Sequence, residues 1–320
     1  MSPAMGGQVE AMESRQDTSF RAFITRHAVL TYFILVFALV WGFPLIIIII
    51  AGPGALLGTG DKLTSPADLP PLMYLVSLTS PLSMALAGIL VIALAFGRVG
   101  LRDLRSRLFT WRVGVRWYAV ALLTAPLLQT AILGAFSLTS QAFLPGIITA
   151  EDKASLLVAG LVAGLVAGFF EEIGWTGFAT AELSKRHGVL ATGLMVGLPW
   201  MVLHLPIYLA TDSGAVPLAL YVPVMLFFFL PYRVLMVWVY DRTQSVLMAV
   251  LMHLMIDVCA FVLASPAMVG VADLIFNLVF GATLWIFVAV VAAADRKKAL
   301  ASRAHASTGK TVERTGLTIC

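Results

Sequence analysis

The stretch ASLLVAGLVAGLVAGFFEEIGWTGF, residues 154–178, decides the fold class of this chain. It is long enough to cross a bilayer, for which a helix needs about 20 predominantly apolar residues. Two adjacent carboxylates, Glu171 and Glu172, interrupt it. A charged side chain near the middle of a bilayer costs at least ~2.5–3.5 kcal/mol, so such residues usually face a bundle interior or a water-filled cavity. The stretch therefore predicts a membrane helix that carries a functional site.

The composition extends this interpretation to the whole chain. Its 320 residues are 60% hydrophobic and only 12% charged, and the mean hydropathy is +0.95, beyond what a soluble globular domain shows. Eight apolar segments are long enough to span a membrane: residues 28–51, 70–97, 115–136, 154–180, 189–210, 215–240, 244–264 and 272–294. We expect an all-α, polytopic membrane protein in which about eight transmembrane helices form a bundle.

The distribution of Lys and Arg predicts the orientation of this bundle. Basic residues gather in the connection 98–116, in the turns 181–188 and 241–243, and after Asp295, all on one side of an eight-span topology. Positive flanks stay on the cytoplasmic side, so both termini are expected in the cytoplasm. We also expect the membrane to be a bacterial cell membrane. Anionic membrane lipids suit the net charge of +4. Nucleic-acid binding is not expected, because no basic cluster is interleaved with aromatic residues.

The chain divides into one membrane domain and two polar ends. We predict a disordered cytoplasmic segment at 1–27, an eight-helix domain at 28–295 and a basic, disordered cytoplasmic tail at 296–320. The first span is too long for the core of a signal peptide and no small-residue cleavage site follows it, so we expect it to be retained. With two cysteines, the sequence favours neither a disulfide framework nor a thiolate metal site.

The spacing of small residues predicts where the two glutamates point. Two rows recur every four positions: Gly160, Gly164 and Gly168, and beside them Ala159, Ala163 and Ala167. Small residues at this spacing let membrane helices approach closely. Continuing the rows reaches Glu172 and Glu171, because residues four apart share one helix face. Both carboxylates are therefore expected to point into the bundle.

Two later apolar segments carry histidines in similar arrangements. His204 lies four residues after Trp200, and His253 lies four residues before Asp257, so each pair shares a helix face. A lone core histidine bonded to a backbone carbonyl is the ordinary explanation for either one. At 1.5 Å rise per residue, however, both histidines lie at a depth similar to that of Glu172. Similar depth on three helices favours a shared site.

This set of residues suits the activation of water for attack on a carbonyl carbon. Glu171 and Glu172 offer a candidate general base, His204 and His253 can orient or polarise, and Asp257 adds a carboxyl group. Alternatively, Glu171, His204 and His253 can hold a divalent metal such as zinc as a two-histidine, one-carboxylate site. The residues alone leave both mechanisms open, and they do not predict an oligomeric state.

The three motifs, EEIGWTGF followed by the two histidine pairs, resemble those of a known family. They are similar to the motifs of the CAAX protease and bacteriocin-processing (CPBP/Abi) family of intramembrane endopeptidases. The resemblance covers roughly residues 75–260. It implies an eight-helix bundle with a cavity open toward the cytoplasm. It also implies hydrolysis of a peptide bond in a membrane-associated or prenylated peptide or protein substrate.

The resemblance also implies roles for individual residues. Glu171 would activate water with help from His204, while His253 and Asp257 would stabilise the oxyanion. We expect a metal-free glutamic mechanism without a cofactor, and a metal-dependent one stays open. An ionised Asp257 would repel the developing negative charge, whereas a protonated one can donate a hydrogen bond. Activity is then expected to fall as the pH rises, and Asp257→Asn to flatten that decline.

Thr176 departs from the family pattern, which has an arginine at this position. Glu172 therefore lacks its expected cation four residues later. Either Glu172 is protonated or another cation replaces the arginine. Arg233 lies at comparable depth in the sixth span, although it can also snorkel to the interface. The departure keeps a non-catalytic immunity or scaffold relative as an alternative function, and a proton-coupled transporter as a lesser one.

Overall fold

The computed structural model describes residues 21–52, 54–57, 71–210 and 216–315, and these form helices joined by turns. Seven helices are long and apolar enough to cross a membrane: Ala28–Ala51, Leu75–Leu108, Val115–Ser137, Lys153–Leu183, Val189–Pro206, Leu218–Thr243 and Val271–Arg296. An eighth apolar helix, Val246–Val262, has only 17 residues. The all-α fold is confirmed, with seven helices among the described residues that could cross a membrane where about eight were predicted. The eighth span and the orientation of the termini stay predictions.

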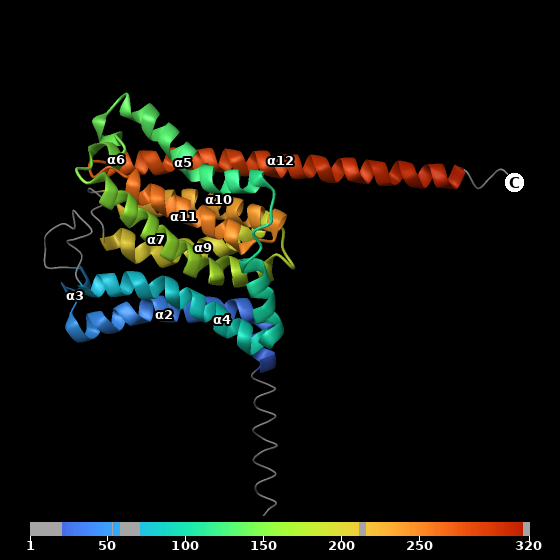
Figure 1. Ribbon diagram of the computed structural model, residues 1–320, viewed down its shortest axis with the longest axis horizontal. Helices are drawn as coiled ribbons and strands as arrows, with labels where there is room; N and C mark the ends of the chain where they lie inside the picture. The colour runs from blue at the N-terminus through green and yellow to red at the C-terminus, as the bar shows by residue number, and fades with distance from the viewer. Residues whose placement is uncertain (1–20, 53, 58–70, 211–215, 316–320) are drawn as a thin grey trace, which may run out of the picture.

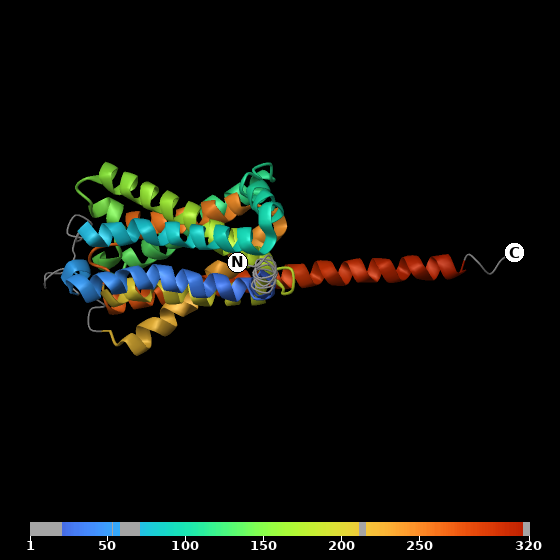
Figure 2. The ribbon, with the colours of Figure 1, turned by 90° about the horizontal axis from the view of Figure 1, so that it is seen from below.

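The long helices lie side by side in a bundle (Figures 1 and 2). In chain order they are α2 (Ala28–Ala51), α4 (Pro71–Leu108), α5 (Val115–Ser137), α7 (Lys153–Gly174), α9 (Val189–Ala210), α10 (Leu218–Thr243), α11 (Val246–Val262) and α12 (Val271–Thr315). The short elements are α3 (Gly54–Leu57), η2 (Gln141–Phe143), α6 (Gly146–Thr149), the π-helical turn η3 (Trp175–Thr180) and α8 (Ala181–Leu183). Helix α7 packs against α11 and α4, while α10 packs against α9 and α12.

The structure describes helix in parts of both ends of the chain, for which disorder is predicted. Residues 21–26 are helical, and α12 continues past the bundle to Thr315 (Figure 1). The tail sequence KKALASRAHA at 297–306 consists mostly of Ala, Lys, Arg and Leu, which have high helix propensity. Its polar character therefore did not exclude a helix. Residues 1–20 and 316–320 lie outside the described residues.

Helix α4 is interrupted at Gly97, where the second predicted span ends. The backbone of Gly97 has φ 60° and ψ −148°, a conformation that favours glycine because other residues carry a Cβ atom. Beyond Gly97 the helix turns away from the direction of the bundle (Figure 1). This turn keeps the basic segment that contains Arg102, Arg105 and Arg107 at one end of the bundle.

The predicted glycine row brings α7 close to α11. A Cβ atom on Gly164 would lie 2.7 Å from the carbonyl oxygen of Leu254, and one on Gly168 would lie 2.9 Å from the backbone nitrogen of Leu254. Cβ atoms do not approach other atoms so closely, so the absence of side chains lets the two backbones meet. This packing brings Glu172 of α7 next to His253 of α11.

Candidate functional site

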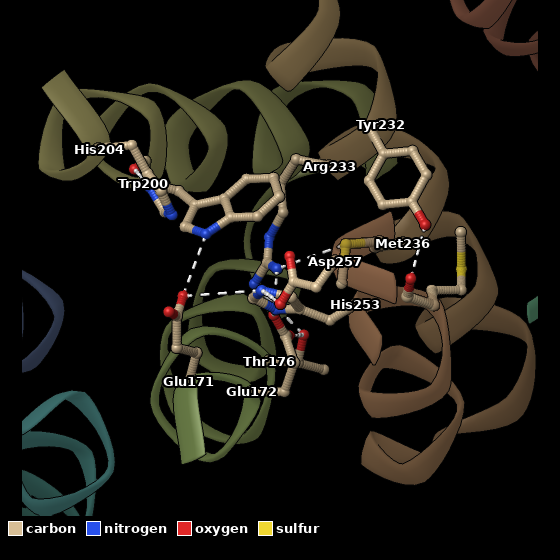
Figure 3. A network of polar contacts seen from close by, with 11 residues as sticks. Glu171, Glu172, Thr176, Trp200, His204, Tyr232, Arg233, Met236, His253 and Asp257 are labelled. Atoms are coloured by element: carbon tan, nitrogen blue, oxygen red, sulfur yellow. Dashed lines mark hydrogen bonds and ion pairs between the residues drawn. The ribbon is translucent and has the colours of Figure 1, made fainter. Parts of the chain in front are cut away.

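Glu171 and Glu172 lie in the last turn of α7, directly before the π-helical turn η3. They are 5% and 0% exposed, so both carboxylates point into the bundle as predicted. The backbone N–H of Trp175 is shared between the carbonyl oxygens of the two glutamates. Single π-helical turns are rare and are frequent at functional sites. Side chains from α9, α10 and α11 converge on this turn (Figure 3).

Hydrogen bonds from three residues fix the Glu172 carboxylate. Its Oε1 accepts from Arg233 Nη1 at 2.7 Å and from His253 Nδ1 at 2.8 Å, and its Oε2 accepts from the Thr176 hydroxyl. Arg233 Nη2 also donates to the Thr176 hydroxyl oxygen at 3.3 Å. Both oxygens of Glu172 are therefore engaged by charged or hydroxyl donors.

Arg233 is the cation that replaces the arginine of the family pattern. Its side chain is 0% exposed, so the alternative that it snorkels to the interface is wrong. The guanidinium also lies over the Trp200 ring, 5.4 Å from the ring centroid, which adds a cation–π contact. Thr176 is shorter than arginine, so the space next to the Glu172 carboxylate is filled by the Arg233 side chain from α10. Removing one partner of a buried ion pair typically costs ~3–5 kcal/mol, because the other charge stays buried.

Glu171 is bound much less tightly than its neighbour. Its Oε2 accepts from the indole N–H of Trp200 at 3.2 Å and lies 3.9 Å from His253 Nε2. Among the residues that the structure describes, its Oε1 has no hydrogen-bond partner. Of the two glutamates, Glu171 is thus the one with acceptor capacity left for a water molecule.

His253 lies between the carboxylates. Its Nδ1 donates to Glu172, since a carboxylate only accepts, and this bond sets the orientation of the ring. The other ring nitrogen, Nε2, lies 3.5 Å from Asp257 Oδ2 and 3.9 Å from Glu171 Oε2. The side chain of Asp257 is 27% exposed, against 2% for His253. His253 therefore presents Nε2 to the more open side of the cluster.

His204 is attached to this cluster through Trp200. Its Nδ1 is 2.7 Å from the carbonyl oxygen of Trp200, and because a carbonyl only accepts, Nδ1 carries the proton. In the neutral ring, Nε2 is then the acceptor. In the part of the chain that the structure describes, His204 makes no hydrogen bond or ion pair with either glutamate. The cluster brings four of the five predicted site residues into direct contact and holds the fifth at its edge.

Comparison with known proteins agrees with this arrangement. Residues 153–259 match the Rce1-like family, described as type II CAAX prenyl endopeptidase Rce1-like. The chain contains a CAAX prenyl endopeptidase domain of the Rce1-like type. This CAAX endopeptidase domain runs from α7 to α11 and includes every residue of the cluster. No curated protein matches the chain. The resemblance is confirmed for 153–259, and its extension to residue 75 stays a prediction.

The metal alternative concerns three residues of the CAAX endopeptidase domain, Glu171, His204 and His253. Among the described residues, no group of three or more His, Cys, Asp or Glu side chains is arranged to hold a metal ion. Arg233 also places a fixed positive charge beside the cluster, 2.7 Å from Glu172. Metal dependence stays a question for experiment.

Two contacts of the CAAX endopeptidase domain were not predicted. The sequence marks Trp200 only as the aromatic partner of His204, yet its indole N–H donates to Glu171. Arg107 looks like a topology signal, yet its Nη1 donates to the carbonyl oxygen of Gly177 at 3.0 Å and to the Tyr240 hydroxyl at 2.9 Å. Arg107 thereby satisfies a carbonyl group of the π-helical turn that follows the glutamates.

Proposed function

We propose that this protein is an intramembrane endopeptidase in which Glu171 is the general base. The observation that carries the proposal is the difference between the two glutamates. Glu172 is saturated by Arg233, His253 and Thr176, whereas Glu171 keeps an oxygen without a partner among the described residues. A general base must be positioned by its surroundings and still be able to accept a proton from water.

In the proposed reaction, the Glu171 carboxylate takes a proton from a water molecule. At the same time, the water oxygen attacks the carbonyl carbon of the peptide bond. The C–O bond forms and negative charge develops on the carbonyl oxygen. His253, with its Nδ1 held by Glu172, presents Nε2 to that oxygen and donates to it when the ring is doubly protonated. The proton on Glu171 then passes to the leaving nitrogen as the C–N bond breaks.

Glu172 and Trp200 have positioning roles in this proposal. Glu172 fixes the His253 ring through its 2.8 Å hydrogen bond, and Arg233 keeps Glu172 charged and in place. Trp200 holds Glu171 by its indole N–H and His204 by its carbonyl oxygen. Because the Nδ1–H of His204 is used in this bond, its Nε2 is left to assist the water molecule. Asp257 faces Nε2 of His253 and balances the charge of the protonated ring.

The proposed substrate is a membrane-associated protein or peptide, including a prenylated one. The printed description of the matched family names CAAX prenyl endopeptidases. The excess of Lys and Arg in the connections near this end of the bundle supports a cluster that opens toward the cytoplasm. The ion pair of Arg233 with Glu172 supplies the cation that Thr176 lacks, and this supports a catalytic protein over a non-catalytic relative.

A cleavage assay with purified protein in detergent tests the proposal. The substrate is a quenched fluorescent peptide with a farnesylated C-terminal Cys motif, and the same peptide without the lipid measures the prenyl requirement. Glu171→Gln should fold normally and lose about 10²–10⁴-fold in rate, the usual contribution of a general base. Glu151→Gln, an exposed glutamate just before α7, is the matched control and should keep the wild-type rate.

The same assay separates the two mechanisms. A metal-free enzyme keeps its rate after treatment with 1,10-phenanthroline, whereas a metal enzyme loses it and regains it with added zinc. Turnover by Glu171→Gln at the wild-type rate would refute the role of Glu171. Absence of turnover in the wild type on both peptides would favour the non-catalytic alternative.

A further inference from the structure

A cavity lies among α5, α10, α11 and α12, and its lining residues do not include those of the glutamate cluster. Its volume is about 420 Å³, and small-molecule sites typically measure ~300–1,000 Å³. Most of its wall is apolar and includes the rings of Phe228, Phe276 and Phe280. None of the residues that carry the proposed hydrolysis lines it. The cavity therefore needs an explanation of its own.

Gln129 of α5 is the unusual residue in this cavity. Its side chain is 6% exposed and lines the cavity wall. Within the described part of the chain its amide makes no hydrogen bond, and its two polar atoms are not among the fully buried atoms that lack a partner, so the amide borders the open space of the cavity. An amide that borders a mostly apolar cavity without a partner is unfavourable, and the other buried residues of α5 are apolar or small. Such a residue inside a membrane bundle points to a ligand that completes its hydrogen bonds.

The polar part of the wall carries negative charge. Asp273 accepts from the Tyr221 hydroxyl at 3.0 Å and from Asn277 Nδ2 at 2.9 Å, and all three residues line the cavity. A carboxylate has about four lone-pair sites, so these two bonds leave Asp273 with acceptor capacity. Among the described residues that line this cavity, none is Lys, Arg or His. The described wall of the cavity therefore offers hydrogen-bond acceptors and the Asp273 carboxylate, and it contains no positively charged side chain.

We propose that this cavity binds an amphiphile with a primary ammonium head, of which one hydrocarbon chain enters the cavity. The hydrocarbon chain packs against the aromatic rings and Met225, and the ammonium donates to Asp273 and to the amide oxygen of Gln129. Buried charges require a partner of opposite sign, and an ammonium supplies one for Asp273. A carboxylate or phosphate head would add a second anion instead. An uncharged alcohol would gain the apolar contacts and lose the ion pair.

The test uses the full chain in neutral detergent with three ligands of equal chain length: dodecylamine, dodecanol and dodecanoate. A ligand that binds the folded state raises the Tm, which intrinsic tryptophan fluorescence reports. We expect dodecylamine to raise the Tm most, dodecanol less and dodecanoate not at all. Equal shifts for dodecylamine and dodecanoate, or no shift with dodecylamine, would overturn the proposal.

Two variants locate the binding site. Gln129→Leu should unfold at the same or a higher temperature than the wild type without ligand, because it removes a buried amide without a partner. Its affinity for dodecylamine should fall about tenfold, the loss expected for one hydrogen bond to a charged group. A purely structural Gln129 predicts the opposite result, a lower Tm with unchanged affinity. This variant keeps the test decisive if replacements of Asp273 do not fold.

Asp273→Asn should weaken dodecylamine binding by at least about tenfold and leave dodecanol binding unchanged. The matched control is Asp241→Asn, at the far end of α10, where the carboxylate is 43% exposed. Its affinity for dodecylamine should equal that of the wild type. Equal dodecylamine affinity in Asp273→Asn and the wild type would contradict the proposed ion pair.

The ammonium group can belong to a free amine or to the ethanolamine head of a phospholipid. Nanodiscs of phosphatidylcholine with and without phosphatidylethanolamine distinguish these sources. Loss of the dodecylamine shift when phosphatidylethanolamine is present identifies the lipid head, and an undiminished shift identifies the free amine. Either result supports the proposal provided that Asp273→Asn abolishes the effect, and an effect that survives Asp273→Asn overturns it.

Discussion

The glutamate cluster and the cavity beside Gln129 are two polar regions in one apolar bundle, and they meet the cost of burial differently. In the cluster, both oxygens of Glu172 have partners, and the fully buried Arg233 balances its charge. In the cavity, Gln129 is buried without a hydrogen bond from any described residue. A network in which every polar group has a hydrogen-bond partner holds its side chains in a fixed geometry, as catalysis requires. A cavity wall with unused donors and acceptors can instead form hydrogen bonds with a ligand.

The largest effect should come from breaking the saturated network. Arg233→Met leaves Glu172 buried without its cation, so we expect a loss of about 3–5 kcal/mol in the free energy of unfolding. Adding Thr176→Arg to this variant returns a cation four residues from Glu172 and should restore part of the loss. Thermal unfolding in detergent and the peptide cleavage rate measure both changes. A fully stable and fully active Arg233→Met would show that the ion pair does not support the site.

The contact between α7 and α11 should give the next largest effect. Gly168→Ala places a Cβ atom 2.9 Å from the backbone nitrogen of Leu254 and 3.0 Å from the carbonyl oxygen of Val250. Overpacking of this kind costs about 1–3 kcal/mol, and it should also lower the cleavage rate by moving Glu172 relative to His253. Gly134→Ala on α5 is the control, since its Cβ meets nothing within 4 Å. Equal stability of the two variants would argue against a tight α7–α11 contact.

Trp200→Phe should have a smaller and more selective effect. It removes the indole N–H that donates to Glu171 at 3.2 Å and keeps most of the aromatic contacts with His204 and Phe229. We expect kcat to fall about tenfold, in line with a net hydrogen-bond energy of about 1 ± 0.5 kcal/mol. The KM should stay close to the wild-type value, because the indole N–H holds the base and not the substrate. A change in KM alone would place Trp200 at the substrate instead.

The smallest effect concerns Asp152, at the end of α7 opposite the glutamates. Hydrogen bonds from the Ser155 hydroxyl and backbone N–H lower the pKa of this exposed N-cap carboxyl. Because the folded pKa is depressed, its contribution to stability is complete above the unfolded value of about 3.9 and is lost as the pH falls below it. Asp152→Asn should therefore lose less stability between pH 6 and pH 3 than the wild type. Tm values across this range measure the difference, with Glu151→Gln as the control.

The features that depend on spacing within one helix were predicted from the sequence. Four-residue spacing correctly placed Gly164, Gly168 and Glu172 on one buried face, because helix periodicity sets direction without knowledge of the neighbours. The alanine row does not share this burial, since Ala159 is exposed, although Glu171 at its end is buried. The spacing of His253 and Asp257 likewise placed both on one face, and their side chains lie 3.5 Å apart. Apolar length identified the spans, although α11 is shorter than predicted.

Contacts between helices were harder to predict. The position of Arg233 within its predicted span suggested that it could be a partner of Glu172. The packing of α10 against the site shows that it forms an ion pair and does not lie at the membrane interface. The indole of Trp200 reaches Glu171 through a rotamer that spacing does not reveal. Gln129 and Asp273 carry the same signal that singled out the glutamates, a polar side chain within an apolar span. Their shared cavity depends on how α5 and α12 meet.

The cation that pairs with Glu172 lies far along the sequence, and this separation affects membrane insertion during synthesis. Arg233 follows Glu172 by 61 residues, and His253 follows it by 81, whereas the family pattern supplies an arginine within the same helix turn. During synthesis, Glu172 reaches the membrane before either partner exists. We expect ribosome-bound chains that end near residue 220 to leave this helix incompletely inserted, and full-length chains released from the ribosome to insert it fully. Complete insertion at both lengths, measured by glycosylation mapping, would show that this carboxylate enters the bilayer alone.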